Sequence, residues 1–488
     1  MDLNLDPFFN PQAIALVGAS DNISSWGFIV AHNIVQNNFQ GKFFPVHLDK
    51  KEILGFEAYP TILDIPKEVK LDLVIIIIPA RYVLSILEQA KKRDVRHVVI
   101  ITAGFRESGD AGRVLEDKVV AYARQNNIRL IGPNGMGIVS TRVSLTAAMW
   151  PVHGLKQGEM TFISQSGNIG TIGLTVASRR GIGLNAYVSV GNMADLTMSD
   201  YLEYFGKYDQ FTKVIGLYVE GVQDSRRFVK LVKEISKTKP VIILKAGGTK
   251  HGSKAALSHT GAITGDDQIF REILEKTAGA IIVESLDEMF DLVLVFSRWS
   301  EYTFPRGKVV ILTRGGGWGV MAADACSKHG IILEPLNKAS FDRINPLLPP
   351  FWSKGNPIDT VASLNLSDVH TIIEIIFEEM PFVEAIFLLG VGGFSFLANL
   401  AKESPLIPDD QKKQLDLIVN IEIKLFEEVI KLSQTHRKPV LITSLLTHEN
   451  SPGVKYLESQ DYPIFPSPSR MVRAFRYMVN YYKWRQRI

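Results

Sequence analysis

With 488 residues, of which 46% are hydrophobic and 22% charged, the chain has the composition of a globular protein with several domains of about 100 to 200 residues each. These values exclude wholesale disorder, collagen and a coiled coil. The 54 Lys and Arg residues nearly balance the 51 Asp and Glu residues, and a net charge of +3 does not favour binding to nucleic acid. Cys326 has no second cysteine to pair with, so we expect a reducing, cytoplasmic location and no structural zinc site.

Neither the N-terminal residues nor the apolar runs of the sequence indicate a membrane segment. Met1–Gln12 lacks the basic start and the apolar run of a signal peptide, and the apolar run Val74–Ile78 is too short to cross a bilayer. We therefore expect a protein that does not associate with membranes.

Short apolar runs alternate with segments of helical periodicity, a pattern typical of parallel sheets with helices on both faces. We expect an α/β fold with three domains, at residues 1–145, 146–300 and 301–488. The strands expected in the first, nucleotide-binding-type domain are Ala13–Val17, Phe43–Val46, Leu71–Ile78, His97–Thr102 and Arg129–Ile131, with a helix at Val83–Lys92. Those expected in the second domain begin near Met160 and include Leu184–Val190, Val214–Val219 and Val241–Lys245. A polar linker, Ser300–Lys308, precedes the strand Val309–Thr313 of the third domain.

The second and third domains share a sequence pattern. Thr161–Gly170 aligns without a gap with Val310–Gly319, and a Lys-Pro-Val tripeptide precedes a later strand in both, at 239–241 and 438–440. A shared strand, glycine-rich turn and helix indicates two copies of one α/β domain.

The first candidate site is the turn Val17–Asn22, which follows a strand and precedes a helix expected to begin near Trp26 or Gly27. N–H groups at such a helix start can bind phosphate. Because the turn lacks the second glycine of the dinucleotide fingerprint, a tight connection without a ligand is an equal alternative. Lys50 and Lys51, after the next strand, are candidates for a second phosphate contact or for a solvated edge.

Two further turns, Ser164–Asn168 and Arg314–Trp318, also join a buried strand to a helix. Helix starts that face one another would hold an anion from both sides. The alternative is two ordinary turns, although three consecutive glycines carry an entropic cost that suggests a close approach to the main chain.

The segment Ala246–Gly265 contains five glycines and two histidines, His251 and His259. Neutral imidazole accepts a phosphoryl group near pH 7, provided that a carboxylate holds its other nitrogen. Glu220, at the end of a neighbouring strand, is the candidate carboxylate for His259. A polar surface histidine is the alternative, and His251 competes for the same role.

With these motifs the chain resembles the ADP-forming acyl-CoA synthetases of the succinyl-CoA synthetase superfamily. The resemblance rests first on the motif Ser258–Gly261, and it extends over essentially the whole chain. The other motifs in the family's order are Val17–Ser20, Ala103–Phe105, Gly132–Asn134, Ser164–Gly167, Val190–Asn192 with Asp195, Tyr218–Glu220, Lys245–Gly247, Gly265–Asp267, Gly315–Gly317 with Ala322–Asp324, Asn356–Pro357 and Pro466–Pro468.

The resemblance implies a Rossmann-like domain that binds coenzyme A, followed by two flavodoxin-like doubly wound domains. It implies that His259 is phosphorylated and that Glu220 supports it. The implied phosphate-binding residues are Gln165, Ser166, Gly167 and Asn168 at one helix start and Gly315, Gly316 and Gly317 at the other. The implied coenzyme A site consists of Gly18, Ser20, Asp21, Asn22, Lys50, Pro79, Thr102, Ala103 and Asn134. We expect no metal ligand in this chain.

The implied reaction converts acyl-CoA, phosphate and ADP reversibly into a carboxylic acid, coenzyme A and ATP through an acyl phosphate and a phosphohistidine. The chain resembles the α subunit, so a partner β subunit with an ATP-grasp domain is expected to carry ADP or ATP and Mg²⁺ in a hetero-oligomer. The expected acid is short or aryl. Two positions depart from the family's common sequence. Gly135-Met136 replaces Cys-Leu near the expected acyl pocket, and His47-Leu-Asp49 replaces Val-Asn-Pro near the expected adenosine end of coenzyme A.

Two other functions compete with this one. A noncatalytic regulatory protein that binds coenzyme A or acyl-CoA would keep the fold without being phosphorylated, but the intact His259 and Glu220 speak against it. A nicotinamide-dependent dehydrogenase is supported by the first domain alone.

Overall fold

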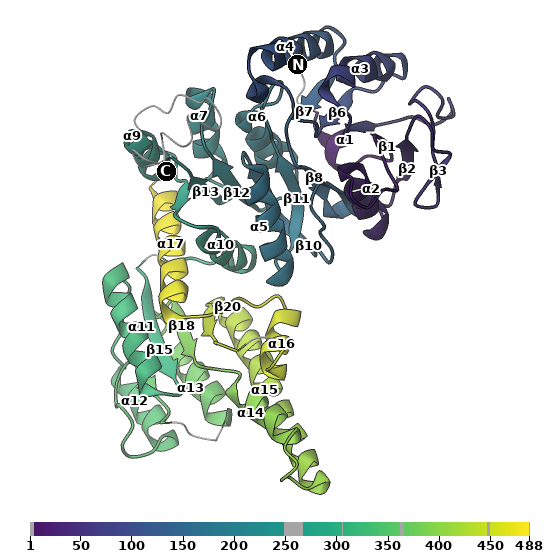
Figure 1. Cartoon of the computed structure of the whole chain (residues 1–488). Coiled ribbons are helices and arrows are strands. Elements are labelled where there is room, and N and C mark those ends of the chain that lie inside the picture. The colour runs from purple at the N-terminus through teal and green to yellow at the C-terminus, as the bar shows by residue number, and fades with distance from the viewer. Residues whose placement is uncertain (1–3, 248–266, 305, 362–365, 447–448, 488) are drawn as a thin grey trace. The chain divides into compact units, whose positions relative to one another are not determined.

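A computed structural model describes residues 4–247, 267–304, 306–361, 366–446 and 449–487 (Figure 1). The chain divides into two compact units, Met1–Met289 and Phe290–Ile488. The first unit contains a five-stranded and a seven-stranded sheet, and the second unit contains a six-stranded sheet. Among the helices that the structure describes, none is long and apolar enough to cross a membrane.

The first sheet is parallel, with the strand order β2-β1-β5-β6-β7. Its strands are β1 (Ala13–Val17), β2 (Lys42–Val46), β5 (Leu73–Ile76), β6 (His97–Ile100) and β7 (Arg129–Ile131). The helices are α1 (Asp6–Phe9), α2 (Trp26–Gln36), α3 (Val83–Lys92) and α4 (Asp110–Gln125), and a small hairpin joins β3 (Glu52–Ile53) to β4 (Phe56–Glu57).

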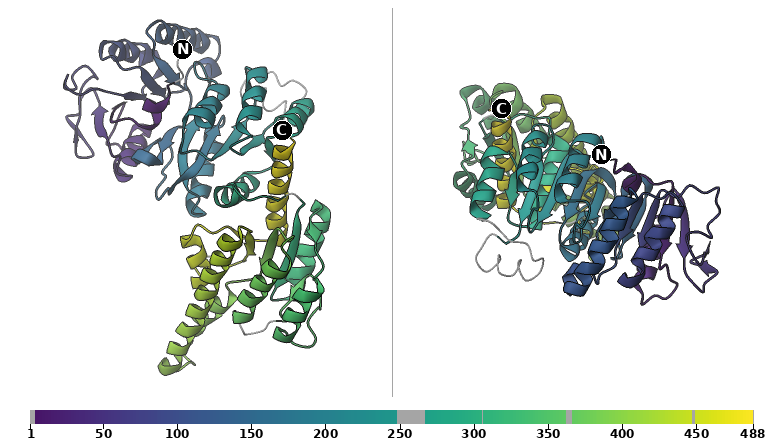
Figure 2. Two further views of the ribbon diagram at one scale, coloured as in Figure 1. Left: turned by 180° about the vertical axis from the view of Figure 1, so that it is seen from behind. Right: turned by 90° about the horizontal axis from the view of Figure 1, so that it is seen from above.

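Alternate residues of β1 enter two different cores. Ile14 and Leu16 lie in the core that contains α2, whereas Ala15 and Val17 lie in the core that contains α3 and α4, so helices cover both faces of this sheet (Figure 2). The chain leaves β1 and β5 toward opposite faces. Ligands of such sheets bind at the carboxyl ends of the strands at this switch point.

The second sheet has the order β14-β13-β12-β10-β11-β8-β9. Its parallel strands are β10 (Gln157–Ser164), β11 (Leu184–Ser189), β12 (Val214–Val219), β13 (Val241–Lys245) and β14 (Ile281–Val283). An antiparallel hairpin of β8 (Gly137–Ser140) and β9 (Leu145–Ala148) pairs with β11. The helices are α5 (Gly167–Arg179), α6 (Met198–Glu203), α7 (Ser225–Ile235), α9 (Asp267–Glu272) and α10 (Leu286–Trp299).

The hairpin ties the first two sheets together, because it follows β7 directly and yet extends the second sheet. A continuous apolar core runs from Ile14 through Ile138 to Ile163. The expected boundary between residues 145 and 146 falls inside β9.

The third sheet has the order β16-β15-β18-β19-β20, with β17 beside β15. Its strands are β15 (Lys308–Thr313), β16 (Ile332–Leu333), β17 (Ile358–Asp359), β18 (Ala385–Leu389), β19 (Val440–Thr443) and β20 (Ile464–Phe465). The helices are α11 (Gly316–His329), α12 (Lys338–Ile344), α13 (Leu366–Glu379), α14 (Gly393–Lys402), α15 (Asp409–His436), α16 (Pro452–Ser459) and α17 (Pro468–Gln486).

The predicted fold class is confirmed, since parallel sheets alternate with helices and the principal parallel strands of each sheet follow the order 2-1-3-4-5 of flavodoxin-like folds. Both Lys-Pro-Val tripeptides lead into the fourth strand of their sheet, β13 and β19. Their lysines are alike as well: Lys239 donates to the carbonyl oxygens of Phe205 and Asp209, Lys438 donates to that of Pro381, and burial lowers both lysine pKa values. The predicted duplication therefore agrees with the strand order and with local hydrogen bonding.

Candidate active site

The turn after β1 brings the start of α2 against the strand. Gly18 has a φ of 94°, and a methyl group on it would lie 2.6 Å from the carbonyl oxygen of Ile77. A methyl group on Gly27, in the first turn of α2, would lie 2.0 Å from the carbonyl oxygen of Gly18. Only glycine fits at both positions. Gly27 thus permits the close approach of helix to strand, a role that the sequence motif did not reveal.

Side chains of this turn hold its own backbone. Ser20 Oγ accepts a hydrogen bond from the Asn22 N–H at 3.0 Å, and Asn22 Oδ1 accepts one from the Ser24 N–H at 3.0 Å. Ser25 caps α2 by accepting from the Phe28 N–H at 3.1 Å. The predicted residues Ser20 and Asn22 therefore shape the turn at the helix start.

An exposed ion pair lies beside the same turn. Lys50, in the loop after β2, has its Nζ 3.0 Å from Asp21, and this hydrogen bond lowers the pKa of the Asp21 carboxyl. Three large apolar side chains nearby are exposed as well, those of Ile23 and Leu48 in these loops and that of Trp26 at the start of α2. A charged pair rimmed by apolar groups suits a ligand with both phosphate and a ring.

The loops after β5, β6 and β7 are joined in series. Thr102 Oγ1 donates to the carbonyl oxygen of Ile78 at 2.8 Å, and the Asn134 N–H donates to that of Thr102 at 2.9 Å. Pro79 and Ala103 are exposed between these contacts. The predicted coenzyme A residues therefore all follow the carboxyl ends of strands along one edge of the first sheet.

The second candidate region is the start of α5. Ser166 is its N-cap and accepts from the Ile169 N–H at 3.4 Å, while Asn168 is exposed. A methyl group on Gly167 would lie 2.3 Å from Cγ of Met136, so the methionine side chain rests against this helix start. The first-turn N–H groups of α5 are donors for an anion.

A buried carboxylate lies at the same edge of the second sheet. Glu220, 6% exposed, follows β12, and Gln165 Oε1 accepts from the N–H groups of Glu220 and Gly221 at 2.6 and 3.1 Å. Lys245 Nζ donates to the carbonyl oxygen of Glu220 at 2.9 Å. The pKa of Tyr218 is raised by burial, by the charge of Glu220 and by a hydrogen bond to its side chain. Gln165 and Lys245, which are far apart in sequence, thus hold the backbone of Glu220.

Both candidate histidines, His251 and His259, lie in residues 248–266, outside the described residues. The described chain reaches this segment through Lys245 and Gly247, and Lys245 pairs with Val219 in the sheet. The last described residues before this segment therefore lie beside Glu220, because Lys245 Nζ donates to the Glu220 carbonyl oxygen and the Ala246 N–H donates to that of Val219.

The glycine turn before α11 belongs to the second unit. A methyl group on Gly317 would meet nothing within 4 Å, whereas one on Gly316 would lie 3.3 Å from Oδ2 of Asp359. The guanidinium of Arg314 lies 3.7 Å from the centre of the Phe394 ring, and burial lowers the pKa of Arg314. Gly315 caps the helix with extended backbone. Pairing of this helix start with that of α5 stays a prediction.

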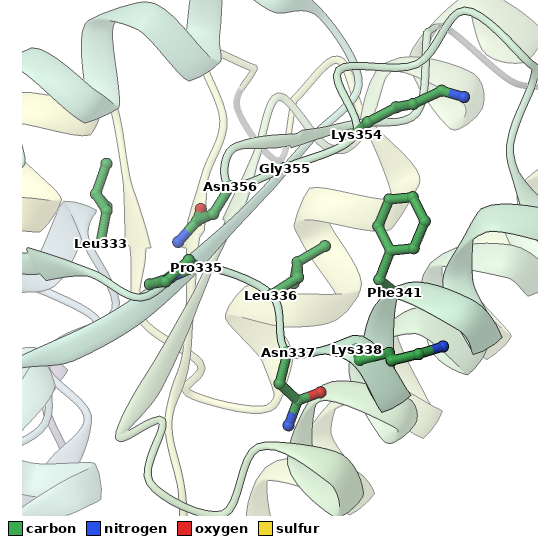
Figure 3. A pocket seen from close by; sticks show the side chains of 9 residues that line it. All are labelled: Leu333, Pro335, Leu336, Asn337, Lys338, Phe341, Lys354, Gly355 and Asn356. Carbon is green, nitrogen blue, oxygen red and sulfur yellow. The ribbon is translucent and has the colours of Figure 1, made fainter.

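The second unit also contains a hollow of about 360 Å³, lined by Leu333, Pro335, Leu336, Asn337, Lys338, Phe341, Lys354, Gly355 and Asn356 (Figure 3). The Asn356 amide donates to the carbonyl oxygens of Val309 and Glu334, and its Oδ1 accepts from the Ile311 N–H. These hydrogen bonds use the Asn356 side chain to hold the fold rather than a ligand. In the described part of the chain, no group of three or more His, Cys, Asp or Glu side chains is arranged to hold a metal ion.

Residues without a predicted role also contact the candidate site. Met136 touches the α5 start, Lys245 holds the Glu220 backbone, and Asn192 Nδ2 donates to Glu107 and Glu116. Lys245 and Asn192 stand in sequence motifs, which was the available signal, but their contacts depend on residues distant in the chain.

The chain matches the family model "CoA binding domain" over residues 12–141 and "Succinyl-CoA ligase like flavodoxin domain" over residues 157–296. It is 38% identical to the acetate–CoA ligase (ADP-forming) II subunit alpha of Pyrococcus furiosus, over 77% of this chain and 80% of that protein. The corresponding I subunit alpha is 33% identical over 99% of both chains. The solved dinucleotide forming acetyl-coenzyme A synthetase 1 of Ca. Korarchaeum cryptofilum, in complex with phosphate and ADP, has a TM-score of 0.83 and 30% identity over 99% of this chain and 98% of that chain. The chain therefore belongs to the family of ADP-forming acetate–CoA ligase alpha subunits.

Proposed function

We propose that this chain interconverts acyl-CoA and phosphate with coenzyme A and a carboxylic acid through an acyl phosphate, and that His259 carries the phosphoryl group to or from ADP. The observation that supports this proposal is the buried carboxylate of Glu220, which lies at the carboxyl edge of the second sheet beside Lys245. Burial of a carboxylate is costly, and such groups are more frequent at functional sites, which favours the catalytic function over the noncatalytic alternative.

Coenzyme A would bind along the carboxyl edge of the first sheet. Its pyrophosphate suits the start of α2, where Lys50 can exchange Asp21 for a phosphate oxygen. From there the long arm of the molecule would pass Thr102 and Asn134 toward the second sheet. The match of residues 12–141 to a coenzyme A-binding family supports this assignment.

Phosphate would bind at the start of α5, with Ser166, Gly167 and Asn168 around it and the glycines before α11 as the second group of donors. A phosphate oxygen attacks the thioester carbonyl carbon, the C–S bond breaks, and coenzyme A leaves as the thiol after protonation. Helix-start N–H groups would stabilise the charge that develops on oxygen. The imidazole of His259 then attacks phosphorus, and the carboxylate of the acid leaves.

Glu220 would hold the other ring nitrogen of His259, which fixes the tautomer and stabilises the charged phosphoimidazole. Gln165 and Lys245 hold the backbone of Glu220 from both sides, so the carboxylate keeps its place through the cycle.

The nucleotide and Mg²⁺ would bind to a partner. Relatives of this chain are named alpha subunits, and the similar solved synthetase is in complex with phosphate and ADP, which supports an ATP-grasp β subunit in a hetero-oligomer. We propose a short or aryl acid as substrate and the cytoplasm as location.

The test uses the full chain with acetyl-CoA and radioactive phosphate. An acid-labile, base-stable label is expected on the wild-type protein and on His251→Ala, and no label on His259→Ala. Label retained by His259→Ala would refute the assignment. Coenzyme A binding without any label in the wild-type protein would favour the regulatory alternative.

A further inference from the structure

A network of side chains joins the first sheet to the second between the two candidate sites. Asn192, in the loop after β11, donates from Nδ2 to Glu107 Oε2 at 2.6 Å and to Glu116 Oε2 at 2.8 Å. Its Oδ1 accepts from Nδ2 of Asn134 at 3.2 Å. Because carboxylates only accept hydrogen bonds, the two glutamates decide which way the Asn192 amide points.

The two carboxylates are themselves held in place. Glu116 is fully buried and forms an ion pair with Arg106. Glu107 accepts from the N–H groups of Gly104 and Phe105 at 2.6 and 3.0 Å. Burial alone would raise the pKa of Glu107, but hydrogen bonds from Asn192 and from these backbone groups outweigh it and lower the pKa. Glu107 is therefore charged at neutral pH.

The backbone of the same loop presses on the chain that follows β7. The Asn192 N–H donates to the carbonyl oxygen of Pro133 at 2.8 Å, and a methyl group on Gly191 would lie 2.1 Å from that oxygen. Asn134 has a φ of 59°, a left-handed conformation that asparagine tolerates. Backbone and side-chain contacts thus hold Asn134 in position.

Asn134 lies on the route from one candidate site to the other. From β1 to β7 the first sheet extends over three strand spacings, roughly 14 Å, so an arm that starts from pyrophosphate at α2 must run along the edge to reach the second sheet. Two residues after Asn134, Met136 contacts the start of α5. The segment between these residues therefore connects the coenzyme A edge with the candidate phosphate site.

We propose that Asn192 is a positioning residue for the thioester end of acyl-CoA. Its Oδ1 accepts a hydrogen bond from Nδ2 of Asn134. The side-chain carbonyl oxygen of Asn134 can then accept a hydrogen bond from an amide N–H of the pantetheine arm. Glu107 and Glu116 act one step further back by orienting Asn192. This inference rests on the proposed function, because it takes the α5 start as the place where the thioester reacts.

The experiment compares two ligands of the full chain by calorimetry: acetyl-CoA, which has the arm, and adenosine 3′,5′-bisphosphate, which does not. For Asn192→Ala the Kd of acetyl-CoA is expected to rise about tenfold, as for the loss of one oriented hydrogen bond, and that of the nucleotide to stay within about twofold. The control is Asn126→Ala, which removes a hydrogen bond to the Tyr122 carbonyl at the end of α4 and should leave both Kd values unchanged.

A merely structural role for Asn192 would weaken both ligands in parallel, and either that result or unchanged acetyl-CoA binding overturns the proposal. If Asn192→Ala does not fold, Glu107→Gln gives the same test, because its amide N–H would oppose that of Asn192 and turn the carboxamide. The binding split does not depend on phosphorylation. A wild-type protein that binds acetyl-CoA without being labelled would therefore refute the proposed function and still decide this inference.

Discussion

The two flavodoxin-like copies, one built on β10 to β14 and the other on β15 to β20, share a strand order but differ at the ends of their strands. By strand pairing, Tyr218 of the first copy corresponds to Leu389 of the second, and Glu220 corresponds to Val391. The second copy therefore has apolar residues where the first has a phenol and a carboxylate.

One hydrogen bond occurs in both copies, but its donor is charged only in the first copy. Lys245 donates to the carbonyl oxygen of Glu220 at 2.9 Å, and the corresponding Ser444 donates to that of Val391 at 2.9 Å. A buried carbonyl must be satisfied in either copy, so the contact belongs to the fold. At these positions the ionic groups occur in the first copy alone, so the predicted duplication would have kept the scaffold in both halves and the proposed chemistry in one.

The carboxylate of Glu220 distinguishes the first copy from the second, and its loss should change the chemistry most. Glu220→Gln should slow phosphohistidine formation about 100-fold, because an amide does not stabilise a charged phosphoimidazole. Val391→Thr, at the matching position of the second copy, should leave the rate unchanged. Labelling time courses with acetyl-CoA and radioactive phosphate measure both, and equal rates for Glu220→Gln and wild type would contradict the role.

A second prediction uses aligned helix glycines. A methyl group on Gly170 would lie 2.1 Å from the hydroxyl of buried Tyr187, whereas one on Gly319 would lie 3.2 Å from Cγ2 of Thr313. Overpacking should make Gly170→Ala about 2 kcal/mol less stable, while for Gly319→Ala the helix propensity of alanine offsets a milder contact to within about 1 kcal/mol. Denaturant unfolding measures both, and similar losses would show that the two helices are packed alike.

The third prediction tests the shared hydrogen bond. Lys245→Met removes the donor to two carbonyl groups, those of Glu220 and Ala246, and should cost about 2 kcal/mol of unfolding free energy. Ser444→Ala removes one neutral donor and should cost about 1 kcal/mol. Labelling should fall for Lys245→Met and persist for Ser444→Ala. A larger loss for the serine variant would reverse the assignment.

The smallest effect concerns alkaline pH. Burial and the charge of Glu220 raise the pKa of Tyr218, so its contribution to stability is complete below the ordinary tyrosine pKa of about 10 and is lost as the pH rises through the folded value. Tyr218→Phe should remove this loss of stability at alkaline pH, because phenylalanine, like the corresponding Leu389 of the second copy, has no ionisable group. Thermal unfolding between pH 8 and 11, read against wild type, measures it; identical pH curves would exclude the contact with Glu220.

Continuous apolar runs made several elements predictable. β1, β7, β12 and β13 have the predicted bounds because buried parallel strands are mainly apolar. The bounds of α3 agree as well, because its buried residues recur with a helical period. We did not predict the short strands β14, β16, β17 and β20, the longer strand β18, or the hairpin of β8 and β9. Two or three residues carry no detectable period, and the hairpin joins the second sheet through pairing with β11, more than 40 residues away in sequence.

The alternation of strands and helices, the glycine turns and the internal repeat were determined by the sequence itself, because each depends on residues within one turn or one strand. Two contacts instead depend on the packed fold: Gln165 reaches Glu220, 55 residues away, and Asn192 reaches Glu107, 85 residues away. The reason is geometric: parallel strands bring the ends of distant segments to one sheet edge, and only the register and direction of each side chain select which groups meet there.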